Sequence, residues 1–177
     1  ILLTFVADFN RFSKWCTYNQ AQPGYNNLVS FTNAVIDTAL AAQNVCIAAE
    51  NNGLGICYLG TTAYNAKEHI EILGLPKLTF PVTTVAIGYP EETPGLTDRI
   101  PVEGIMHDEL YQDYDRDRIN ELYAFKESLE SSKVFVAENG KQTLAQVFTD
   151  VRYKKADNEF FSAKMLETIK AQGFWAD

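Results

Sequence analysis

The chain has 177 residues, of which 46% are hydrophobic, and its formal net charge at pH 7 is −8. This length suits one compact domain with its own core, and we expect residues 1–177 to form a single domain. The acidic balance argues against a nucleic-acid or an anionic-membrane partner, because both bind a basic face. No apolar run approaches the roughly 20 residues that a membrane-spanning helix needs.

The cysteines and histidines give no sign of a disulfide framework or a metal site. Cys16, Cys46 and Cys57 have neither a disulfide-rich nor a zinc-binding spacing. His69 and His107 lie in separate segments with scattered acids, so no metal site is predicted. Cys46 and Cys57 lie in apolar segments, where a buried thiol is usually inert, and core packing is favoured over thiol chemistry. We expect a reduced, cytoplasmic protein.

The first half of the chain alternates between predicted strands and helices. Apolar runs with β-branched and aromatic residues predict buried strands over residues 1–6, 54–59 and 80–87. Residues 28–51 are apolar nearly all round and rich in alanine, which predicts a central, buried helix that stops before Gly53. Asn65 is expected to cap a short helix that runs to Leu73. Polar loops are predicted over 17–27 and 91–101, and a turn over 7–11 in which Asp8 and Arg11 bond.

Helices dominate the second half, so the chain as a whole is predicted to have the α+β class with a helical extension over residues 116–177. Helices are expected over 117–132 and 143–148, and a last one begins at Asn158 and ends before Gly173. Residues 105–114 are rich in aromatic side chains and look like an extended arm. Such an arm either wraps a partner subunit or packs on its own domain.

Three groups of residues are candidates for a binding site. Glycines around residues 53–61 let the backbone approach a flat ligand, although the local pattern fits a tight helix-to-strand turn better. Arg99 can grip a phosphate bidentately, or it is a solvated or ion-paired residue beside Asp98. The only basic cluster can meet the phosphates of a nicotinamide cofactor or is a solvated loop, and it consists of Arg152, Lys154 and Lys155. No dinucleotide or nucleotide-triphosphate motif is present.

Taken in order, several segments resemble the nitroreductase family, and in particular its branch of oxygen-insensitive, NADPH-dependent nitroreductases and flavin reductases. The resemblance covers about residues 1–115 and rests on the ADFNR turn and on residues 42–50, 53–60, 75–76, 82–90, 98–101 and 107–111. Residues 172–175 also look like the family's C-terminal end. Each segment alone is weak evidence for the family, but the order and spacing of the segments together are fairly specific to it.

The resemblance implies a sandwich with a mixed sheet flanked by helices, a homodimer, and FMN reduced by NADPH or NADH. It implies small-molecule acceptors, namely nitroaromatics, quinones or free flavin. No catalytic side chain is implied, because the flavin carries the reaction. It places the isoalloxazine edge of FMN against Tyr58, Leu59, Gly60 and Thr61, with main-chain amides near Leu59–Gly60 facing its N5 region.

For the remaining candidates the resemblance implies that Arg99 contacts the FMN phosphate and that Arg152, Lys154 and Lys155 contact the nicotinamide cofactor. Two departures weaken the match. Thr97 stands where this branch often has a lysine, and the family's N-terminal helices have no counterpart, so residues preceding Ile1 are expected to be missing. The alternative is a truncated or diverged relative that binds no flavin and acts as a dimeric binding or structural protein.

Overall fold

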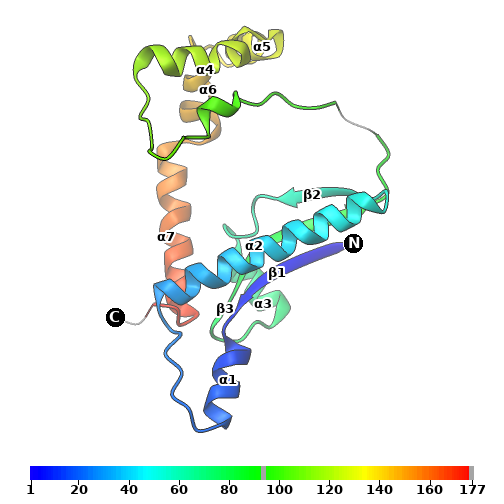
Figure 1. Ribbon diagram of the computed structural model, residues 1–177, viewed down its shortest axis with the longest axis vertical. Helices are drawn as coiled ribbons and strands as arrows, with labels where there is room; N and C mark the ends of the chain where they lie inside the picture. Colours follow the sequence, from blue (N-terminus) through cyan, green and yellow to red (C-terminus); the bar gives the residue numbers. More distant parts are fainter. Residues whose placement is uncertain (93–94, 176–177) are drawn as a thin grey trace. The chain divides into compact units, whose positions relative to one another are not determined.

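The structure is a computed structural model that describes residues 1–92 and 95–175 (Figure 1). The chain divides into two compact units, one of residues 1–92 with 159–177 and one of residues 93–158. Helices and a small antiparallel sheet confirm the predicted α+β class.

The sheet lies in the first unit and has its strands in the order β1-β3-β2, namely β1 (Leu2–Asp8), β3 (Thr79–Gly88) and β2 (Gly55–Leu59). Both pairings are antiparallel, so the expectation of a mixed sheet is wrong for the described strands. The register of β1 against β3 shifts between Phe5 and Val6, where Val6 faces Pro81. Proline has no amide hydrogen for a ladder bond, and a central strand tolerates it at such an irregularity.

The first strand is less buried than its apolar sequence predicts. Ile1 and Leu2 are 79% and 67% exposed, whereas Ala7 near the other end is fully buried. β1 is an edge strand, and the described residues leave its start uncovered. The prediction of a strand here is confirmed, and the prediction that it is buried throughout is wrong.

A helix that the sequence did not predict follows β1. It is α1 (Asn10–Tyr18), and it replaces the end of the predicted turn and the beginning of the predicted loop. The Asp8 carboxylate accepts a hydrogen bond from the main-chain N–H of Arg11 at 3.1 Å. The two residues therefore bond as predicted, but through the backbone of Arg11. The bond stabilises the start of α1, because it satisfies a free N–H of the first helical turn.

The long helix α2 (Leu28–Asn51) has the predicted bounds. The side chain of Asn27 accepts from the Ser30 N–H at 2.9 Å, and Gly53 has a left-handed φ of 74° just past the end. One side of α2 packs on the sheet, and its buried residues include Phe31, Ala34, Ala42, Cys46 and Ala49 (Figure 1). The other side is exposed, so the prediction of a helix buried all round is wrong for the described chain.

The C-terminal segment closes the core of the first unit. Helix α7 (Lys155–Ala171) begins before Asn158, which is therefore inside the helix and does not cap it. Gly173 follows its end with a φ of 85°. The Gln172 side chain donates to the carbonyls of Pro76 and Thr79, at 3.0 and 2.9 Å. Phe174 is fully buried against helix α2 and strand β3, with α3 (Ala66–Leu73) in the same core.

The second unit is irregular at first and helical afterwards. It contains the short turn η1 (Val102–Gly104), α4 (Arg116–Ser128), α5 (Glu130–Glu138), α6 (Leu144–Val147) and the π-helical turn η2 (Phe148–Arg152). The single helix predicted over 117–132 is wrong, because Leu129 is extended, with ψ 137°, and separates α4 from α5. A capping box of Thr143 and Gln146 begins α6.

Residues 105–114 form neither a helix nor a strand and fold back within the second unit. The Tyr114 hydroxyl donates to the Gly104 carbonyl at 2.7 Å and lies 3.3 Å from His107 Nε2. The rings of His107 and Tyr111 are 4.3 Å apart. These contacts lie within the second unit, and the wrapping of a partner subunit by this segment stays a prediction.

Candidate functional site

The free edge of β2 presents main-chain groups that the sheet does not use. In an antiparallel strand, successive residues direct their N–H and C=O groups to alternate neighbours. Ile87 exchanges both bonds with Ile1, at 2.6 and 2.9 Å, so its polar groups face β1. By alternation, Thr84 faces β2, where its partner is Leu59. The Leu59 carbonyl therefore points into the sheet.

The amide of Gly60 points the opposite way. The Leu59 carbonyl and the Gly60 N–H belong to one peptide group, and in a trans peptide they are antiparallel; no cis peptide bond is present in the described chain. The Gly60 N–H is thus directed away from β3 and toward the free edge of the sheet. Such an outward N–H is a ready donor for a ligand that lies along this edge.

The glycines of this segment have different roles. Gly53 needs its left-handed φ of 74° to end α2. A Cβ at Gly55 would lie 3.2 Å from Pro90 Cβ, so Gly55 serves close packing. A Cβ at Gly60 would meet nothing within 4 Å, and its φ is not left-handed. The turn interpretation therefore holds for Gly53, whereas at Gly60 the fold itself does not require glycine and the space beside the backbone is open.

Tyr58 lies beside this open space and is held by α2. Its side chain is 41% exposed, and its hydroxyl donates to Gln43 Oε1 at 3.2 Å. Hydrogen bonding with the neighbouring Cys46 thiol, followed by desolvation, raises the pKa of Tyr58 to about 12. The phenol is therefore neutral at physiological pH. Thr61 is exposed, and its carbonyl accepts from the Asn65 N–H at 3.1 Å.

Thr62 is a candidate site residue that sequence reasoning did not single out. It is only 2% exposed, and its hydroxyl donates to the Leu59 carbonyl at 3.2 Å. A threonine next to the quoted segment gave no signal, because its importance depends on the peptide group to which it bonds. It joins Tyr58–Thr61 in the first unit, and these residues form one continuous site that we call the β2 edge.

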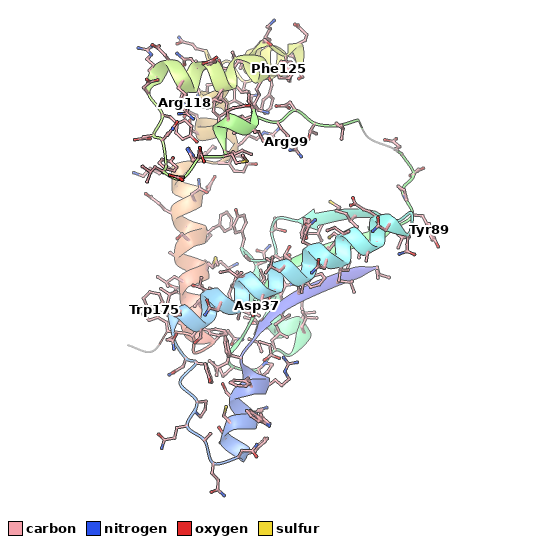
Figure 2. The ribbon with its side chains drawn as sticks, in the orientation of Figure 1. Asp37, Tyr89, Arg99, Arg118, Phe125 and Trp175 are labelled. Carbon is pink, nitrogen blue, oxygen red and sulfur yellow. The ribbon has the colours of Figure 1, made fainter. Side chains whose placement is uncertain are left out.

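Arg99 belongs to the second unit, on the irregular segment before η1 (Figure 2). Its guanidinium donates to the Asp98 carbonyl at 2.9 Å and to the Thr97 hydroxyl. The Asp98 carboxylate forms an ion pair with Lys126, with Nζ and Oδ2 2.7 Å apart, and the hydrogen bond from Lys126 lowers the pKa of the Asp98 carboxyl. The alternative of an Asp98–Arg99 ion pair is therefore not realised. Arg99 is exposed and bonds within its own loop, and the β2 edge is in the other unit.

The basic cluster of the second unit is exposed. The guanidinium of Arg152 lies over the ring of Phe135, 4.9 Å from its centre. Lys154 and Lys155 follow it at the start of α7. These contacts leave the cation of Arg152 accessible, and they do not connect it to the β2 edge, which belongs to the first unit.

Other candidate chemistry finds no support among the described residues. No group of three or more His, Cys, Asp or Glu side chains in residues 1–92 and 95–175 could hold a metal ion. Cys16 and Cys46 are buried, but Cys57 is exposed, so its predicted burial is wrong: its side chain lies on the opposite face of β2 from Tyr58. None of the described helices combines the length and apolar character that a bilayer crossing requires.

Comparison with known proteins finds consistent relatives. The family model described as "Nitroreductase family" matches residues 17–89. An oxygen-insensitive NADPH nitroreductase of Salmonella typhimurium is 38% identical over 111 residues, which are 63% of this chain and 45% of that protein. An NAD(P)H-dependent FMN reductase of Bacillus subtilis is 32% identical over 145 residues, which are 81% of this chain and 57% of that protein. The chain thus spans about half the length of these two relatives.

A crystal structure of a Bacteroides fragilis protein described as an oxidoreductase superposes on this chain with a TM-score of 0.95. It is 57% identical, and the superposition covers 99% of this chain and 71% of that one. The similarity therefore extends over both units and includes the β2 edge.

Proposed function

The chain belongs to the nitroreductase family, and from this premise we propose that it is part of an FMN-dependent NAD(P)H oxidoreductase. The acceptors that we propose are nitroaromatics, quinones or free flavin. The single observation that carries the proposal is the β2 edge, where an outward main-chain N–H lies beside the open space at Gly60. The names of the relatives, an NADPH nitroreductase and an FMN reductase, support the same chemistry.

The β2 edge fits a flat, polar-edged cofactor. In our proposal Gly60 donates its N–H to FMN, Tyr58 and Leu59 flank the ring system, and Thr61 lies at its margin. Bound FMN supplies the transfer of hydride from NAD(P)H to the acceptor. The protein's part is to orient the flavin through directed main-chain donors and to keep the space beside Gly60 free of side chains. The neutral Tyr58 adds no charge next to the flavin at physiological pH.

The two cationic sites of the second unit are proposed as phosphate contacts. Arg99 would bind the FMN phosphate by exchanging its bonds to Thr97 and Asp98 for bidentate bonds to the ligand. Thr97 takes up a guanidinium donor, and it stands where the resemblance to the family leads us to expect a lysine. Arg152, Lys154 and Lys155 would meet the phosphates of NAD(P)H. These assignments predict weaker phosphate binding than in a protein with that lysine.

A homodimer is proposed from the exposed side of α2. Val29, Ile36, Leu40 and Ile47 are 47–69% exposed. At 100° per residue their positions fall within about 20° of one line along the helix, opposite the side that packs on the sheet. An apolar stripe of this kind is characteristic of a surface that another chain covers.

Light scattering should give twice the chain mass for the unmodified protein, and Leu40→Glu should give the mass of the monomer.

A cytoplasmic location and an acidic surface that binds no nucleic acid complete the proposal. The net charge of −8 supports the second point. The three cysteines are free, which is compatible with a reducing compartment.

The deciding experiment is a visible absorption spectrum of the purified protein, repeated on the supernatant after denaturation. We expect a flavin spectrum that moves to the supernatant and a holoprotein that bleaches with NADPH or NADH in the absence of oxygen. A holoprotein that keeps its colour with both donors would contradict the oxidoreductase.

The alternative, a flavin-free relative that acts as a dimeric binding or structural protein, makes the opposite prediction. It is motivated by Thr97 and by the share of its relatives that the chain spans. A colourless protein that leaves the fluorescence of added FMN unchanged would favour it, whereas saturable quenching would contradict it.

A further inference from the structure

We infer that Thr62 is a positioning residue, which fixes the direction of the Gly60 N–H and thereby sets how tightly the β2 edge holds a flavin. The inference rests on the function proposed above. It adds a residue that never touches the ligand: the buried Thr62 hydroxyl bonds to the Leu59 carbonyl on the other side of the same peptide group.

The geometry of one peptide group links the two residues. The Leu59 carbonyl lies at the last paired position of β2, opposite Thr84. Beyond it the chain leaves the sheet, so ladder bonds no longer hold the plane of the Leu59–Gly60 peptide from the Gly60 side. The Thr62 hydroxyl supplies a second bond to that carbonyl, at 3.2 Å. Because the peptide is planar and trans, fixing its oxygen also fixes its N–H.

The bond should also make the Gly60 N–H a better donor. Hydrogen bonds to a carbonyl polarise the peptide group, and chains of hydrogen bonds strengthen one another. Thr62 is 2% exposed, so water does not compete strongly for its hydroxyl. The neighbouring Tyr58, whose hydroxyl is held by Gln43, keeps the other side of the segment in place.

The test uses a matched pair of threonines. Thr62→Val keeps the shape of the side chain and removes the hydroxyl, whereas Thr62→Ser keeps the hydroxyl. Thr79→Val is the control, because the Thr79 hydroxyl also donates to a carbonyl three residues earlier, that of Pro76, at 2.6 Å, and Thr79 is similarly buried at 4% exposed. The readout is the Kd for FMN from quenching of its fluorescence, with the melting temperature of each variant beside it.

We expect Thr62→Val to raise the Kd about two- to tenfold, the range that one net hydrogen bond gives. Thr62→Ser should restore binding to within about twofold, and Thr79→Val should leave it within about twofold while lowering the melting temperature about as much as Thr62→Val does. A Kd for Thr62→Val equal to that of the unmodified protein overturns the inference. If the unmodified protein binds no FMN, the proposed function fails as well, so the two failures are distinguishable.

A second measurement needs no variant and tests the outward direction of the Gly60 N–H, on which the inference depends. Amide hydrogen exchange of the unmodified protein, followed by NMR, reports directly on Gly60. We expect its amide to exchange fast without FMN, because it points away from the sheet, and to be protected when FMN is added. Slow exchange without FMN would mean that the N–H is already bonded inside the protein and would overturn the inference.

Discussion

At the scale of single residues, the β2 edge depends on the backbone conformation and the nearest atoms of each residue. Gly53, Gly55 and Gly60 are the same residue type within eight positions, yet one ends a helix, one allows close packing and one leaves open space. The local sequence pattern allowed a backbone approach to a flat ligand but favoured a tight helix-to-strand turn, and it could not distinguish the roles of the three glycines. Each role depends on φ and on the nearest atoms, and both are set by the sheet pairing.

Gly60→Ala tests the open space directly. The added methyl group meets nothing within 4 Å and needs no left-handed φ, so we expect the free energy of unfolding to change by no more than about 1 kcal/mol, with a gain as plausible as a loss. We expect FMN affinity to fall about tenfold or more, because the methyl group occupies the approach of the ligand. Fluorescence titration and thermal melting measure the two effects.

Gly24→Ala is the control for that variant. A Cβ at Gly24 also meets nothing within 4 Å, and this loop residue is not part of the β2 edge. Unchanged FMN affinity in Gly60→Ala would remove Gly60 from the site.

At the scale of elements, local patterns predicted where most of the helices and strands lie, but they did not predict which elements pack against one another. The bounds of α2 are those predicted, because its start at Asn27 and its stop at Gly53 are local signals. The single helix predicted over 117–132 fails at Leu129, where no proline or glycine marks the break. The Asn158 cap fails too, because α7 already begins at Lys155.

Asn27→Ala tests the local start of α2. Its side chain satisfies the Ser30 N–H at 2.9 Å, and loss of such a cap costs about 1 kcal/mol of the free energy of unfolding. We expect the midpoint of urea unfolding to fall accordingly.

Asn26→Ala is the matched control, because Asn26 is exposed and precedes the cap. Equal destabilisation by the two variants would show that the cap is not what stabilises α2.

At the scale of the whole molecule, the C-terminal segment packs against the first half of the chain within the first unit. The Leu78 N–H donates to the Gln172 carbonyl at 2.8 Å, and Phe174 lies edge-on to Phe31, with ring centres 5.1 Å apart. Residues 94 and 143 positions apart thus share one core. That residues 1–177 form one domain, as the length suggests, stays a prediction beside the division into two units.

Phe174→Ala tests this closure. Phe174 is fully buried, and removal of such a ring costs about 3–5 kcal/mol through lost transfer energy and the cavity left behind. We expect a large fall in the melting temperature measured by circular dichroism. Trp175→Ala is the comparison, because Trp175 is 38% exposed and its ring contacts Lys170; a fall as large as that of Phe174→Ala would contradict the role of Phe174 in the core.

The sequence alone determined the α+β class, the three strand segments, the long helix and the family, because hydrophobic period, helix-ending glycines and ordered short motifs are properties of neighbouring residues. Tertiary structure decided which backbone groups face outward at the β2 edge, that the Thr62 hydroxyl bonds to the Leu59 carbonyl, that Cys57 is exposed, and that Asp98 pairs with Lys126 rather than Arg99. Those outcomes depend on strand register and on contacts between distant segments, which no local pattern encodes.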